Sequence, residues 1–208
     1  MRFTCFIDTS SYINLTNFQF NKGTLLHLLH EKVNIRFSSE VNYEIGKHYD
    51  IRMPSNVERS SKVYRPLRYN HLEYEKRIFD NNVKRESGNL GERDNFSSML
   101  DFYLKQAHGG IIFLSDDVKA IDGNFIEPLS SFPICKVWNS FDTILFLLIS
   151  HKFVTIDVAM TAIKDLDSFM ATDDEKMDPE KTKKRIQRRK FYLKCVDRIN
   201  HVLFIKNY

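Results

Sequence analysis

Acidic residues follow two apolar segments of the chain at the point where each segment ends. Asp8 follows residues 3–7, and Asp116 and Asp117 come shortly after residues 111–114. Short continuous apolar runs of this kind are typical of strands that are buried on both faces of a parallel sheet. Because ligands bind at the carboxyl ends of such strands, we expect these carboxylates to converge at one edge of the sheet.

Two more acidic pairs are candidates for the same edge. Glu40 and Glu44 are four residues apart, so they share one face of a helix, and we expect one to be a ligand and the other its neighbour. Glu92 and Asp94 open a helix expected over residues 92–107. Counting 100° per residue places Glu92 near the apolar stripe of that helix and Asp94 almost opposite, which favours Glu92 as the ligand.

A cluster of carboxylates needs a proton or a cation. Two carboxylates about 5 Å apart at an effective dielectric constant near 20 repel each other by roughly 3 kcal/mol. Hard oxygen ligands select Mg²⁺ or Mn²⁺. The cysteines, Cys5, Cys135 and Cys195, are widely spaced in apolar or helical contexts, so we expect buried thiols rather than a zinc site.

Composition limits the class of protein. The 208 residues, 42% of them hydrophobic, suffice for one domain with a core and an appendage, and they exclude disorder throughout the chain. The longest apolar run, residues 144–149, is too short to cross a bilayer. We expect a cytoplasmic protein with no membrane contact.

Strand and helix signals alternate along the chain, which predicts an α/β fold with a parallel central sheet. The expected strands are residues 3–7, 33–37, 111–114 and 134–138. Helices are expected at residues 24–31, after a cap at Ser38 or Ser39, over 92–107, from 139–142 onward and over 155–169.

Two segments depart from this alternation. Residues 46–90 are polar, with ten Lys or Arg against six acids over 46–89, and they are either a surface excursion or an arm that grips a substrate or a partner. Residues 171–208 form a basic helical extension after a domain over 1–170. Its basic run is a solvated helix face or a nucleic-acid contact, with seven cations: Lys181, Lys183, Lys184, Arg185, Arg188, Arg189 and Lys190.

Four acidic motifs in this order resemble those of the PIN-domain ribonucleases. The motifs are FIDTS at 6–10, SSEVNYEI at 38–45, GERD at 91–94 and FLSDDVKA at 113–120, and NSFDTILF at 139–146 resembles the start of a closing helix pair. The resemblance covers about residues 1–170 and implies a three-layer α/β/α architecture.

The resemblance also implies roles for individual residues. It assigns the Mg²⁺ or Mn²⁺ ligands to Asp8, Glu44, Asp117 and either Glu92 or Asp94. Residues expected close to the metal or the phosphate without necessarily binding the metal are Thr9, Ser10, Glu40, Asp116 and Asp142, and Asp116 is more typical of a helix cap than of a ligand.

The function implied is metal-dependent hydrolysis of RNA, single-stranded or structured, with DNA as a second candidate substrate. Small bacterial members are often toxins of toxin–antitoxin modules or related defence effectors, so an antitoxin or defence-complex partner and a homo-oligomer are expected. The long segment at 46–90 and the basic extension depart from the usual toxin. The alternative is a catalytically silent subunit that binds nucleic acid or regulates a larger complex.

Overall fold

The parallel sheet expected from the sequence is present. The computed structural model describes residues 3–20, 23–48, 63–64, 90–106, 109–117, 135–151, 154–171 and 177–205. Its central sheet contains β1 (Thr4–Ile7), β4 (Asn34–Arg36), β5 (Ile111–Leu114) and β6 (Cys135–Trp138), in the order β4-β1-β5-β6 with every neighbouring pair parallel. A short antiparallel pair, β2 (Gln19–Phe20) with β3 (Gly23–Thr24), lies outside this sheet.

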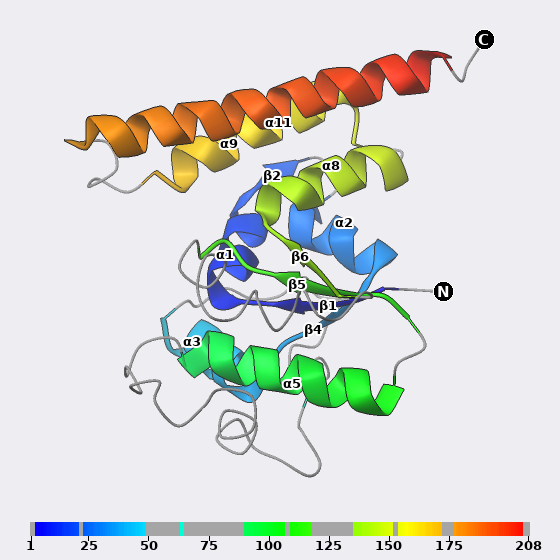
Figure 1. Cartoon of the computed structure of the whole chain (residues 1–208), viewed down its shortest axis with the longest axis vertical. Coiled ribbons are helices and arrows are strands. Elements are labelled where there is room, and N and C mark those ends of the chain that lie inside the picture. The colour runs from blue at the N-terminus through cyan, green and yellow to red at the C-terminus, as the bar shows by residue number, and fades with distance from the viewer. Residues whose placement is uncertain are drawn as a thin grey trace.

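Helices lie on both sides of the sheet (Figure 1). The described residues contain seven: α1 (Thr9–Asn17), α2 (Leu25–Lys32), α3 (Ser39–His48), α5 (Leu90–Gln106), α8 (Ser140–Ser150), α9 (Ile156–Phe169) and α11 (Pro179–Ile205). Alternation along β1 explains the two sides: Phe6 packs with α5, whereas Cys5 and Ile7 belong to the larger core beneath α1, α2 and α8. Among these described helices, none combines the length and the apolar character that a bilayer crossing requires.

Most helices begin at polar side chains that the sequence places there. Thr24 and Thr155 accept backbone N–H groups at the starts of α2 and α9, and Ser38 does the same for α3. Helix α1 was not expected, because residues 9–17 carry few strong helix formers. It forms nevertheless, since Asp8 caps it and Tyr12 and Leu15, one turn apart, are fully buried.

The segment expected to form an arm returns to the domain at one point. Val63 forms a parallel bridge with Phe37, just after β4, and the Tyr64 hydroxyl donates to Asp101 of α5 at 2.7 Å. The remainder of residues 49–89 lies outside the described residues, so the arm stays a prediction.

The expected C-terminal extension packs onto the domain through α11. Figure 1 shows α11 running along α9 and across α8. Tyr192 and Val196 are buried in the main core, and the Tyr192 ring stacks on Phe141 with 5.0 Å between ring centroids. Helix α11 therefore docks on the domain through one face, while Phe191, Val202 and Leu203 stay exposed.

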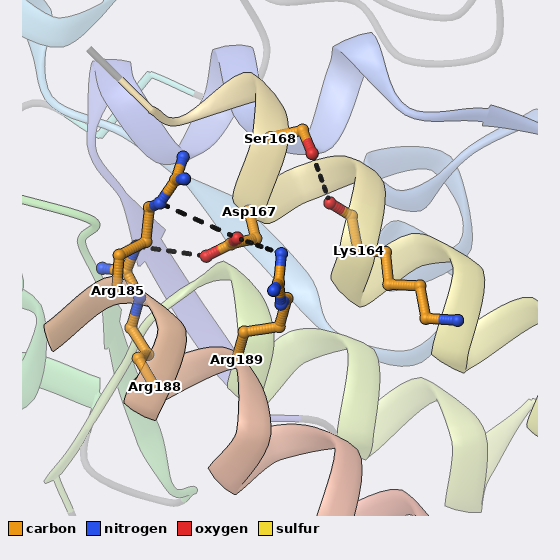
Figure 2. Close-up of polar contacts among 6 residues, drawn as sticks. All are labelled: Lys164, Asp167, Ser168, Arg185, Arg188 and Arg189. Atoms are coloured by element: carbon orange, nitrogen blue, oxygen red, sulfur yellow. Dashed lines mark hydrogen bonds and ion pairs between the residues drawn. The ribbon is translucent and has the colours of Figure 1, made fainter. Parts of the chain in front are cut away.

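A buried carboxylate joins α9 to the basic end of α11 (Figure 2). Asp167 of α9 has 1% of its side chain exposed. Arg189 donates to it at 3.3 Å, while Arg188 and Arg185 lie 3.9 and 4.0 Å from its oxygens, at ion-pair distances. Three of the seven cations of the basic run therefore hold the two helices together.

This arrangement predicts the effect of removing the carboxylate. Asp167→Ala leaves three partly buried guanidinium groups without their counter-charge, so we expect a loss of about 3 kcal/mol in the free energy of unfolding. Urea denaturation measures it. Asp165→Ala, two residues earlier at an exposed position, is the matched control and should change stability little. Equal stability of the two variants would contradict a docking role for Asp167.

Candidate metal site at the carboxyl edge of the sheet

The strand order creates a crevice between β1 and β5. The chain leaves β1 toward β4 on one side and leaves β5 toward β6 on the other, so these two central strands flank a topological switch point. The pairing continues past the strands, because the Asp8 N–H donates to the Leu114 carbonyl at 3.0 Å. Asp8 and residues 115–117 are therefore side by side at the position where open α/β sheets bind ligands.

Asp8 is the most enclosed carboxylate of this edge, with 2% of the residue exposed. It accepts the Ser11 N–H at 2.7 Å as the N-cap of α1, and it accepts the hydroxyls of Ser10, at 3.0 Å, and of Ser115. Asp8 is therefore both the acid expected at the end of β1 and the N-cap of α1. Ser10 contacts the carboxylate, as expected for a residue close to the site.

The environment of Asp8 disfavours its ionised form. Burial raises the pKa of the Asp8 carboxyl to about 7, and the charge of Asp116 raises it as well, against the lowering effect of the bonds from Ser115 and Ser11. A carboxyl in this state gains from any cation that arrives beside it. The hydrogen bonds of Asp8 with Leu114 and Ser115 show that the segments after β1 and β5 lie close together.

Asp116 is committed to protein donors. Its oxygens accept the Asn14 amide at 2.7 Å, the Ser140 N–H at 2.8 Å and the Ser140 hydroxyl. It thus joins α1 to the first turn of α8, which agrees with the expectation of a capping role. Asp117 is half-buried and donates its backbone N–H to the Ser115 hydroxyl oxygen at 3.2 Å.

Glu44 reaches the same edge from α3. The Thr9 hydroxyl donates to its carboxylate. Because Thr9 directly follows Asp8 in the sequence, this bond holds Glu44 at the same end of β1 as Asp8. Gly91, in the first turn of α5, packs against this carboxylate: a Cβ on Gly91 would lie 2.7 Å from both of its oxygens. The start of α5 therefore meets α3 at the acidic edge, and only glycine leaves room for Glu44 there.

One of the two acids of the GERD motif, Asp94, differs from the expectation. The prediction that Asp94 faces away from the interior is wrong: it is 7% exposed and accepts the Glu40 N–H at 3.0 Å, supporting the start of α3. The helical-stripe argument failed because α5 is buried on several faces, with polar Asn95, Ser97 and Ser98 enclosed too. Glu92 follows Gly91 in the backbone, and its side chain lies outside the described residues.

Asp142 has a structural role next to the site. Asn139 and Asp142 form a reciprocal capping box at the start of α8, and the Tyr192 hydroxyl donates to Asp142 at 3.0 Å. Burial raises the pKa of the Asp142 carboxyl, and the charge of Asp116 adds to that effect. Both carboxylate oxygens of Asp142 therefore accept hydrogen bonds from the protein, one from the Asn139 N–H and one from the Tyr192 hydroxyl.

The oxygen atoms of this edge are of the kind that binds a hard cation, but the described acidic side chains do not surround a common point. Carboxylates and hydroxyls dominate the edge, as Mg²⁺ and Mn²⁺ require. Within the part of the chain that the structure describes, no three acidic, histidine or cysteine side chains converge to hold a metal. Both oxygens of Asp8 already accept hydrogen bonds, from Ser10, Ser11 and Ser115.

The basic run of α11 separates into two sets. Arg185, Arg188 and Arg189 are partly buried against Asp167, and the Arg188 guanidinium lies 5.1 Å from the centre of the Phe141 ring. The exposed set consists of Lys181, Lys183, Lys184 and Lys190. Phe141 follows Ser140, which bonds to Asp116, so Arg188 is connected to the acidic edge through two neighbouring residues.

Sequence reasoning assigned no roles to Asn14, Ser115, Ser140 and Gly91. Ser115 was visible between the strand and the two aspartates, but nothing marked it as the donor to Asp8. Gly91 precedes the helix expected over residues 92–107, and in the structure its missing side chain leaves space for the Glu44 carboxylate. Comparisons with known proteins add no relatives: no family model, no curated protein and no solved structure matches this chain.

Gly91→Ala tests the packing against Glu44. The added methyl group would overlap a carboxylate at the end of a flexible side chain, so we expect Glu44 to move while the fold is kept or gains up to about 1 kcal/mol from helix propensity. Calorimetry in the presence and absence of Mn²⁺ separates the two effects: unchanged or higher Tm without metal, and a smaller metal-induced rise. An undiminished rise with metal would show that Glu44 needs no such space.

Asp8 predicts a pH dependence with a definite sign. Because its pKa is higher in the folded state, the folded protein holds this proton more tightly, and stability falls as pH rises from about 4 to about 7 and then levels. Asp8→Asn removes that loss while keeping a capping amide. The Tm of the variant minus that of the native protein, without metal, should therefore grow from pH 5 to pH 8. A constant difference would contradict the raised pKa.

Proposed function

We propose that this chain is a metal-dependent endoribonuclease of the PIN type, hydrolysing phosphodiester bonds of single-stranded or structured RNA. The observation that carries the proposal is the meeting of Asp8 with residues 115–117 at the switch point between β1 and β5, with Glu44 tied to it through Thr9. Acids from three separate segments lie along the carboxyl edge of the parallel sheet, where open α/β sheets bind ligands.

The proposed Mg²⁺ or Mn²⁺ ligands are Asp8, Glu44, Glu92 and Asp117. Such an ion, when bound, activates water and offsets charge on the reacting phosphate. The protein's own residues contribute by holding the carboxylates in position. Ser11 and Ser115 orient the Asp8 carboxylate, and Thr9 orients that of Glu44.

RNA would reach this edge across α11. The four exposed lysines neutralise backbone phosphates, while the arginines hold the helix in place and leave a surplus of positive charge over the single Asp167. DNA carries the same phosphates and is the second candidate polymer. The proposed cellular setting is a cytoplasmic toxin–antitoxin or phage-defence effector, with an antitoxin or defence-complex protein, or a second copy of the chain, as partner.

One observation favours a second candidate function. The carboxylates of Asp8 and Asp116 are already supplied with hydrogen bonds from Ser11, Ser115, Asn14 and Ser140, as in an edge that serves the fold alone. A silent subunit that binds nucleic acid or regulates a complex would keep these contacts and the basic helix. Turnover separates the two candidates.

The test is cleavage of single-stranded RNA, tRNA and single-stranded DNA by the purified chain with Mn²⁺, Mg²⁺ or EDTA. We expect RNA cleavage with either ion and none in EDTA. Asp8→Asn and Asp117→Asn should each reduce the rate by 100-fold or more, on the order of the 2.7 kcal/mol that one catalytic contact supplies.

Asp157→Asn, at an exposed position in the first turn of α9, is the matched control and should cleave at the native rate. Full activity of Asp8→Asn or Asp117→Asn would refute the assignment of the site. RNA binding without cleavage under any ion would favour the silent subunit.

A further inference from the structure

A pocket of about 420 Å³ lies between the end of α1 and the last turns of α9. Its size falls within the range of roughly 300–1,000 Å³ found for small-molecule sites. The residues that carry its chemistry are three amides, two aromatic rings and one acid: Asn14, Asn17, Gln19, Phe18, Phe169 and Asp165.

The pocket adjoins the acidic edge through Asn14. This residue lines the pocket, and its side-chain amide also donates to Asp116 at 2.7 Å. Asn14 is 8% exposed, and its bond to Asp116 fixes the position of its side chain. A ligand in the pocket is thus one side chain away from the carboxylates at the switch point.

The lining discriminates against phosphate. Asp165 brings negative charge, and no lysine or arginine is among the described residues that line the pocket. Amide groups, in contrast, offer donors and acceptors together, and Phe169 is 53% exposed at the rim, which leaves ring surface for a flat ligand to cover. Flat rings edged with hydrogen-bonding groups are the chemistry of nucleobases.

Helix α9 carries the pocket and the arginine contacts on different faces. Asp165 and Phe169 are four residues apart and share the pocket face. Asp167 lies between them in sequence and points instead to the arginines of α11, as Figure 2 shows. A nucleobase placed in the pocket would therefore meet the amides, the rings and Asp165, while the arginines stay with Asp167.

We propose that this pocket is a base-binding subsite of the nuclease, selective for nucleobases that carry an exocyclic amino group. The inference rests on the proposed function and adds its substrate selectivity. Phe169 stacks on the base, Asn17 and Gln19 bond to its edge, and Asp165 accepts the amino N–H. Adenine, cytosine and guanine carry such a group and uracil does not, so uracil binds most weakly.

Nucleosides test the pocket without involving the acidic edge, because they carry no phosphate and need no metal. Adenosine, cytidine and uridine are titrated in EDTA into the ¹⁵N-labelled full chain, and the side-chain amide signals of Asn14, Asn17 and Gln19 are followed by NMR. We expect these signals to shift with adenosine and cytidine, and uridine to bind at least 5-fold more weakly. Phe169→Ala should weaken binding by 5-fold or more, corresponding to about 1 kcal/mol of stacking.

Matched variants separate stacking and edge recognition from general effects. Phe169→Tyr keeps an aromatic face and should bind as the native chain does, and Asp165→Asn should reduce the preference over uridine. Phe191→Ala removes a similarly exposed ring, 57% accessible on α11 and outside the pocket, and should change nothing.

The outcomes are independent of cleavage. Base-selective binding that depends on Phe169 supports the subsite even if the chain hydrolyses no RNA, in which case only the nuclease proposal fails. Shifts absent from the three amides, equal affinity for all nucleosides, or binding unaffected by Phe169→Ala would overturn the subsite, whatever the cleavage assay shows.

Discussion

The burial of the Asp8 carboxylate between β1 and β5 is the constraint on which the rest of the edge depends. Removing an ionised carboxyl from water costs several kcal/mol unless other groups replace the water. Here the Ser11 amide and the Ser10 and Ser115 hydroxyls do so, while the charge of Asp116 works against ionisation. The same bonds start α1 and join it to the end of β5. They therefore stabilise the local fold and at the same time lower the pKa of Asp8, against the larger effect of burial.

From this edge a series of polar contacts extends to the far helices. Asp116 holds Ser140 at the start of α8, where the Asn139–Asp142 capping box receives the Tyr192 hydroxyl of α11. The ring of Tyr192 stacks on Phe141, and the Arg188 guanidinium lies 5.1 Å from the centre of the same Phe141 ring. The basic helix is therefore positioned relative to the acids by buried contacts, which a flexible tail would not provide.

The sequence predicted the parts of this structure that depend on local pattern. Apolar runs followed by acids located β1, β5 and the edge where they end, and the polar group at Asn139 located the start of α8. What it did not predict depends on contacts between distant segments. Asp94 is enclosed because α5 is covered on several faces. Asp167 accepts a hydrogen bond from Arg189, 22 residues later, because α9 and α11 pack together, and residue spacing in the sequence does not predict that packing. Gly91 matters because Glu44 arrives from another helix.

The bonds that stabilise the acidic edge also determine how it would accept a cation. Each donor now bound to Asp8 or Asp116 compensates part of the desolvation of a carboxylate, which lets the fold form with the acids close together. A divalent ion carries far more charge than a hydroxyl dipole. If such an ion bound, it would stabilise the carboxylate charge in place of the serine hydroxyls. These hydroxyls could then donate to water or phosphate. Backbone donors such as the Ser11 N–H, fixed by α1, would stay. The edge therefore combines a rigid part that preserves the fold with a replaceable part suited to binding.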